Sequence, residues 1–315
     1  MDEEADMNQE LGALNREAIA AAQEEMGALA WGTVCLVAVV LGAFIANLGL
    51  FAAGWMPLWA AVPIYAVLTY LSYTPLHEAA HGNINGKHRH LQWLNDGCGY
   101  LVAPIIMIPY ASHKIEHFTH HRYTNQAGKD PDHVVSSMGD GLAGFVTGGL
   151  KMLWTQNSFL FVSHWSGMSV RERSVFALEV TVSLGWRIAF LAWMASLAAV
   201  IMLVAGYLIG AFFLVYWFSY RPHAPFQSSG RYQNTSSLIM PRWMKPIEWF
   251  WLGQNLHSIH HLFPRVPFYR YHALHRRIEP IMRAHGTPII GIFNRHEVGA
   301  LGERSPVHGA RPGDA

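Results

Sequence analysis

The segment His77-Glu-Ala-Ala-His81 directly follows a run of 51 residues, 26–76, that contains no Asp, Glu, Lys, Arg or His. Because a hydrocarbon core takes about 20 apolar residues per helix, this run predicts two membrane spans, with a turn at Gly54-Trp-Met-Pro57. The second span leads straight into the two histidines. Side chains that can bind a metal therefore stand where a membrane helix reaches water.

The composition of the whole chain also indicates a membrane protein. Hydrophobic residues make up 51% of the 315 residues and charged residues only 14%, with a formal net charge of +1. This is apolar for a soluble domain, and the balanced charge argues against a nucleic-acid partner. The two cysteines, Cys35 and Cys98, are too few for a disulfide framework.

A second charge-free run, 188–220, predicts two further spans, and one long helix is the alternative. Glu179 and Arg187 interrupt the start of the apolar sequence that leads into it. We therefore expect an all-α integral membrane protein with about four transmembrane helices and a cytosolic helical cap that carries the histidines. The expected spans cover about 28–50, 58–76, 178–199 and 202–220.

The two ends of the chain are expected to lie outside this domain. Residues 1–26 are acidic and lack the basic region of a signal peptide, so they predict a retained cytosolic tail. The membrane domain is expected to cover 27–285. Gly, Pro and charged residues accumulate toward the C-terminus and predict a partly disordered tail over 286–315.

Basic residues predict the orientation. The loops near residues 54 and 201 have none, the tail from Arg221 onward has twelve, and the segment between the two pairs of spans has eight. By the positive-inside rule, that segment and both termini are expected in the cytoplasm, which suits a protein of the bacterial inner membrane. The eight residues are Lys87, Arg89, Lys114, Arg122, Lys129, Lys151, Arg171 and Arg173.

Closely spaced histidines occur in three segments, 77–81, 117–121 and 257–261. All three segments have a helical spacing and are predicted on the same side of the membrane. Residues three and four apart lie on one face of a helix, and the spacing holds in each segment. These eight imidazoles are more than one metal ion can use, and His223 follows the last span immediately. We therefore predict two metals and nine candidate ligands: His77, His81, His117, His120, His121, His223, His257, His260 and His261.

The type of metal is left open by the ligands alone, because imidazole suits Zn, Cu, Fe and Ni. His77-Glu-Ala-Ala-His81 also reads as H-E-x-x-H, the signature of zinc metalloproteases. Such a site needs only one further protein ligand, and it leaves the other two segments unexplained. An intramembrane zinc hydrolase is therefore a remote alternative, as is a non-catalytic metal- or haem-binding membrane protein.

An all-histidine site needs further groups to orient the imidazole rings. The sequence offers acidic and amide side chains, and one more histidine, close to the three segments. We predict no catalytic residue beyond the metal ligands, and the supporting candidates are Glu78, His113, Glu116, Asp130, Asp132 and Asn255.

In order, spacing and predicted sidedness, the three segments resemble the histidine boxes of the membrane fatty acid desaturase and hydroxylase superfamily, over roughly residues 60–285. The resemblance implies two non-haem irons held by the boxes, with His223 matching the family's extra histidine. It also implies O2 as co-substrate and electrons from a ferredoxin, cytochrome or reductase. The substrate would be a lipid or carotenoid taken from the bilayer.

Several flanking segments look similar to bacterial carotenoid β-ring hydroxylases, among them His121-Arg-Tyr-Thr-Asn125, Pro222-His-Ala-Pro-Phe226 and 252–271. Glu78 and Ala224 depart from the pattern of those enzymes, which have Asp and Arg there. The resemblance implies hydroxylation of a carotenoid β-ring, in carotenoid biosynthesis. Fatty acyl desaturation is the alternative, because the boxes do not separate the two reactions.

Overall fold

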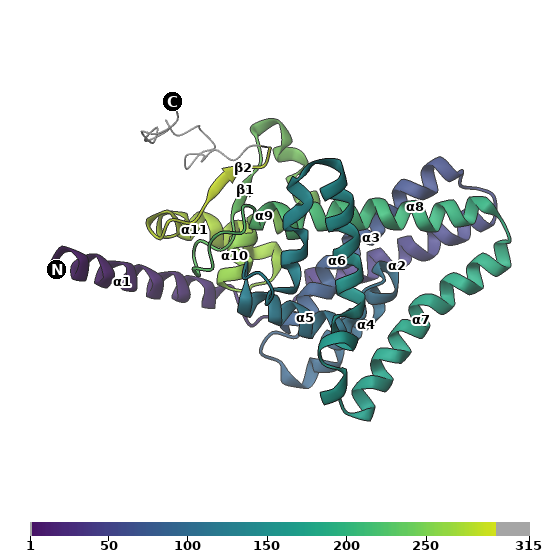
Figure 1. Cartoon of the computed structure of the whole chain (residues 1–315), viewed down its shortest axis with the longest axis horizontal. Coiled ribbons are helices and arrows are strands. Elements are labelled where there is room, and N and C mark those ends of the chain that lie inside the picture. The colour runs from purple at the N-terminus through teal and green to yellow at the C-terminus, as the bar shows by residue number, and fades with distance from the viewer. Residues whose placement is uncertain (1, 294–315) are drawn as a thin grey trace.

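The computed structural model describes residues 2–293, and most of them are helical. Figure 1 shows long helices extending from one side of the molecule and α1 (Asp2–Glu24) projecting from the other. Shorter helices and turns fill the body between them. The helical class predicted from the sequence is therefore confirmed.

Among residues 2–293, three helices are long and apolar enough to cross a membrane. They are α2 (Trp31–Ala52), α7 (Val170–Met194) and a continuous stretch, Leu197–His223. That stretch joins α8 (Leu197–Leu214), a π-helical segment (Val215–Tyr220) and α9 (Arg221–His223). The three match the predicted spans 28–50, 178–199 and 202–220.

The break between α7 and α8 excludes the single long helix. Ala195 has φ 42°, and the Ser196 hydroxyl accepts from the Ala199 amide to begin α8. α7 begins earlier than predicted because Ser169 and Glu172 form a capping box. The fourth predicted span, 58–76, lies within α3 (Leu58–His81), which is not among the three apolar helices, so its crossing stays a prediction.

α8 packs closely on α3 through two glycines one turn apart. A Cβ atom on Gly206 would lie 2.7 Å from the Tyr65 ring, and one on Gly210 would collide with the Ala66 carbonyl. Small residues at this spacing let two membrane helices approach. α3 therefore runs through the centre of the molecule and ends at His81, where Gly82 has φ 68°.

The two charges that interrupt the apolar sequence of α7 bind the ends of α4 (Gln92–Ile106) and α5 (Tyr110–Tyr123). The Glu179 carboxylate accepts from the Tyr110 amide at 2.6 Å and from the Ala111 amide at 3.1 Å. Arg187 donates to the carbonyls of Pro104 and Ile105 at 2.8 and 2.9 Å. These bonds satisfy backbone groups that helix ends leave free, and they fix α5 to a membrane helix.

The remaining elements surround this centre. α6 (Gly141–Ser163) packs on α5 and on a 3₁₀ segment, Pro131–Gly139. α10 (His257–Leu262) packs on α11 (Tyr271–Ala284), and α1 covers α11 with Ala18, Ala21 and Ala22. Further 3₁₀ turns are Arg89–Leu91, Trp165–Gly167, Arg242–Trp251, Gln254–Leu256 and Phe268–Arg270.

A short parallel sheet corrects the all-α prediction. β1 (Ser237–Ile239) pairs with β2 (Ile289–Gly291), with Leu238 opposite Ile290. The all-α prediction missed it because three-residue strands are too short to show an alternating pattern. Ile289, Ile290 and Ile292, which fall in the predicted tail, are buried, and the partly disordered tail itself stays a prediction. The rest of that tail, 294–315, lies outside the described residues.

Candidate metal centre

The nine predicted ligands reach one place from four parts of the fold. The end of α3 supplies two histidines, α5 supplies three, α10 supplies three, and His223 ends the stretch that begins with α8. Seven of the nine are buried, and His121 and His261 are partly buried. Segments about 180 residues apart in the sequence therefore converge on one site.

Within the site the histidines form two groups of four. In each group, one ring nitrogen from every member lies within 4.8 Å of the others. The first group is His77, His81, His117 and His260, and the second group is His120, His223, His257 and His261. His121 lies between them, because it forms a further such set with His260 and His261.

The contacts between ring nitrogens fit lone pairs that converge on a metal. The Nε2 atom of His260 lies 3.0 Å from Nε2 of His77 and 2.8 Å from Nε2 of His121. A single imidazole nitrogen has either one proton or one lone pair, so it cannot bond well to both neighbours. Two nitrogens that bind one metal at about 2.1 Å and at right angles lie about 3 Å apart.

Two buried nitrogens support the same interpretation. Nε2 of His81 and Nε2 of His223 have no hydrogen-bond partner anywhere in residues 2–293. An orphaned buried polar atom is costly, and a metal ion in each group would satisfy it. The donor set therefore fits two bound metal ions.

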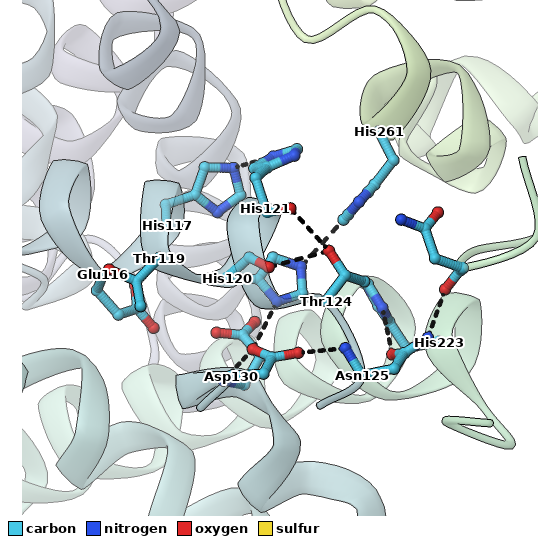
Figure 2. Close-up of polar contacts among 12 residues, drawn as sticks. Glu116, His117, Thr119, His120, His121, Thr124, Asn125, Asp130, His223 and His261 are labelled. Atoms are coloured by element: carbon cyan, nitrogen blue, oxygen red, sulfur yellow. Dashed lines mark hydrogen bonds and ion pairs between the residues drawn. The ribbon is translucent and has the colours of Figure 1, made fainter. Parts of the chain in front are cut away.

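Oxygen atoms outside the two groups orient three of the rings, and Figure 2 shows two of them, His120 and His223. Nδ1 of His120 donates to Asp130 at 2.8 Å, and Nδ1 of His223 donates to the Asn125 side-chain carbonyl at 3.1 Å. Nδ1 of His260 lies 3.2 Å from the Tyr271 hydroxyl. A proton on Nδ1 leaves the Nε2 lone pair free to face the metal.

Asn125 and Tyr271 were missed by the sequence analysis as supporting residues. Asn125 follows the end of α5 with φ 63°, a conformation that asparagine tolerates. Its side-chain Nδ2 atom donates to the backbone carbonyls of Ser228 and Asn234, both at 2.7 Å. A usable signal was its place at the end of the flanking segment 121–125, whereas no spacing pointed to Tyr271 on α11.

The predicted supporting residues divide into two sets. Asp130 binds His120, and Asp132 lies within 4.8 Å of both. The Glu116 carboxylate lies 3.4 Å from His113, a histidine that belongs to neither group. The three carboxylates adjoin His120 of the second group, whereas the His113 ring stacks on His117 of the first group with centroids 5.1 Å apart.

Glu78 and Asn255 bind elsewhere. Glu78 is about 100° around α3 from His77, and it accepts from the Asn83 side chain at 3.1 Å. The Asn255 side chain donates to Leu238 and Glu248. Within the described part of the chain, neither side chain forms a hydrogen bond to an imidazole, so support of the site by these two residues stays a prediction.

Burial keeps most of the imidazoles neutral, which is the form that binds metal. It lowers the pKa of His257 to about 3. His120 differs: burial alone would lower its pKa, but the Asp132 and Asp130 carboxylates raise it to about 9. A more basic imidazole is a stronger donor to a metal once the metal has displaced its proton.

Residues 53–293 match the family described as Fatty acid desaturase. The sn-1 oleoyl-lipid 12-desaturase of Anabaena variabilis is 22% identical over 279 residues, covering 79% of this chain and 76% of that protein. The chloroplastic Omega-6 fatty acid desaturase of Spinacia oleracea is 24% identical over 279 residues, covering 79% and 59%.

A third relative is the Delta(5) fatty acid desaturase of Caenorhabditis elegans, 23% identical over 253 residues, covering 68% of this chain and 55% of that protein. The chain thus spans less than two thirds of the spinach and nematode proteins. The family match, in contrast, covers most of the chain and includes all three histidine segments. This chain belongs to the fatty acid desaturase family.

Proposed function

We propose that the chain is a membrane di-iron oxidoreductase that uses O2 to remove hydrogen from a long apolar lipid. Acyl desaturation is the reaction that the relatives favour. The observation that carries the proposal is the pair of adjacent four-histidine groups in a chain of this family. Each group would hold one iron, with His121 between them.

Bound iron supplies the O2 activation that such chemistry needs. The protein's part is to hold the ligands and exclude water. Asp130 and Asn125 orient His120 and His223, and burial of the first group keeps its surroundings dry. Electrons would come from a ferredoxin, cytochrome or reductase, and the lipid would enter from the bilayer.

The reaction has two candidates. The relatives named above are desaturases, which supports removal of two hydrogens from an acyl chain. Hydroxylation of a carotenoid β-ring is second. It is favoured by the segments 121–125 and 222–226, which resemble carotenoid hydroxylases and meet through the bond between Asn125 and His223.

The test is mass spectrometry of lipid and pigment extracts from cells that make a β-ring carotenoid. The cells would express the intact chain, His120→Ala, or the control His90→Ala, which changes an exposed histidine outside both groups. We expect acyl chains that have lost two hydrogens with the intact chain and the control only. Carotenoids that gain one oxygen per ring would establish the second candidate instead.

Iron and zinc analysis of the purified chain tests the metal. We expect about two irons per chain, since each group has ligands for one. One zinc per chain, with proteolysis that needs only His77, His81 and one further ligand, would replace the proposal with the hydrolase. The structure gives that alternative little support, because Glu78 binds Asn83.

A further inference from the structure

Two pockets follow one another along α7, the outer one mainly against α4 and α5 and the inner one mainly against α6. The outer pocket, of about 600 Å³, is lined by Tyr100, Lys114, Leu160, Arg171 and Val175, among others. The inner pocket, of about 360 Å³, is lined mainly by apolar side chains, including Trp154, Phe161, Phe176, Val180 and Leu184. The two are adjacent along α7, because residues 168–175 line the outer pocket and residues 176–184 line the inner one.

The order of the pockets matches the order of polarity in a lipid monolayer. Arg171 lies in the first turn of α7, at the charged end of a helix that can cross a membrane. Val180 and Leu184 follow it by nine and thirteen residues, which is about 14 and 20 Å along the helix. Half of a hydrocarbon core is about 15 Å thick, so the inner pocket lies at the depth of acyl chains.

The outer pocket has two cations available for an anion. Across residues 2–293, neither Lys114 nor Arg171 forms an ion pair; the Lys114 ammonium lies 5.3 Å from the centre of the Tyr110 ring. Two carboxylates, Asp96 and Glu172, line the same pocket, and both already accept hydrogen bonds. Asp96 accepts from the Tyr110 hydroxyl at 2.8 Å, and Glu172 accepts from the Ser169 amide at 2.8 Å.

We propose that these pockets together bind one glycerophospholipid, with its phosphate at Lys114 and Arg171 and one acyl chain in the inner pocket. Basic side chains at the membrane surface attract anionic lipid head groups. The apolar walls of the inner pocket suit the chain. The site is independent of the proposed reaction.

The bound lipid is not in the position of a substrate. Ile115 lines the outer pocket and is two residues, or about 200° of helix, from His117 of the first group. The lipid therefore lies behind α5 rather than at the histidine groups. It lies beside the bonds from Glu179 to the Tyr110 and Ala111 amides, where it would hold the start of α5 against α7.

The experiment uses the full chain in mild detergent, titrated with phosphatidylglycerol and followed by native mass spectrometry. The double variant Lys114→Gln/Arg171→Gln should bind this lipid about 25-fold more weakly, at about fivefold per charge. The matched control is Lys151→Gln, which removes an exposed charge on α6 outside both pockets. We expect the control to bind as the intact chain does.

Two further arms separate the ligand's parts. Val180→Trp and Ser158→Phe fill the inner pocket from opposite walls, and each should reduce lipid binding while leaving the circular dichroism spectrum unchanged. Inorganic phosphate alone should not compete. Equal lipid binding by the intact chain and the double variant, or full competition by inorganic phosphate, would overturn the phospholipid site.

Discussion

The two histidine groups use the same type of ligand, imidazole, in different surroundings. The first group packs at the end of α3, where the His77 and Tyr73 rings lie 5.4 Å apart between centroids and the Tyr271 phenol is a polar neighbour of His260. The second group is held by the Asp130 carboxylate and the Asn125 amide. A pocket of about 260 Å³ lined by polar side chains also reaches His223 and Asn125.

This difference separates two ways of fixing a metal ligand. Packing positions the first group, and charge and hydrogen bonds position the second. A carboxylate behind an imidazole raises its basicity, so the second group should respond to loss of charge and the first should not. The following predictions test that contrast, from the largest effect to the smallest.

Replacing His260 should have the largest effect. Its Nε2 atom touches His77 and His121, so it belongs to the first group and to the set that joins the two. We expect His260→Ala to lose most of its iron and to turn over at least about 10³-fold more slowly. Where several residues act together, removing one can cost nearly as much as removing all of them. Iron analysis and product mass spectrometry measure the two losses.

The exposed His90→Ala serves as the control for that variant and should retain iron and activity. If His260→Ala kept one iron per chain in the second group and full turnover, the two groups would work independently. The different surroundings of the two groups would then belong to two separate metal sites and not to one joint centre.

Asp130→Asn should weaken iron binding selectively in the second group. The variant keeps the shape of the side chain but removes the charge beside His120, and Asp130 also accepts from the amides of Asn125 and Asp132. Loss of such a partner typically costs about 10–100-fold in metal affinity. Graded chelation should therefore release one iron early and leave the other.

An equal release of both irons from Asp130→Asn would show that the carboxylate serves the whole centre. Asp140→Asn is a matched control, since Asp140 is exposed and belongs to neither histidine group. This control should release its two irons as the intact chain does.

The sequence predicted the ligands of both groups because helical spacing is local. His117, His120 and His121 share a face of α5 whatever the rest of the fold does. It could not predict which histidines would combine, since His117 joins the first group and His120 the second only through the placement of α3 and α10. Proximity in the sequence also suggested Glu78 as a support, and the rotation of α3 turns it away.

Contacts between segments far apart in the chain also could not be predicted from the sequence. Tyr271 meets His260 because α11 folds back on α10, and Glu179 reads as an interruption of a membrane span until α5 is placed beside it. The parallel pairing of 237–239 with 289–291 is set by the packing of α10 and its neighbours. In each case the side chain was visible but its partner was not.

Tyr271→Phe should have a smaller effect, confined to the first group. The phenol is neutral and makes one contact with His260, at 3.2 Å. Removing it deletes a hydrogen bond worth about 1 kcal/mol, so iron affinity in the first group should fall less than about tenfold. Chelation kinetics of this variant and of Asp130→Asn should show opposite orders of release, and the same order in both would break the contrast.

Glu179→Gln should have the smallest effect on iron and should not distinguish the groups at all. The carboxylate accepts from two backbone amides at the start of α5, and a glutamine can accept from only one of them through its carbonyl oxygen. A buried amide left without a partner costs about 1–3 kcal/mol, so the thermal midpoint should fall. Because α5 supplies His117 to the first group and His120 to the second, both irons should loosen together. Selective loss of one iron would mean that Glu179 acts on a single group. The two groups would then depend differently on the attachment of α5 to α7, although α5 supplies ligands to both.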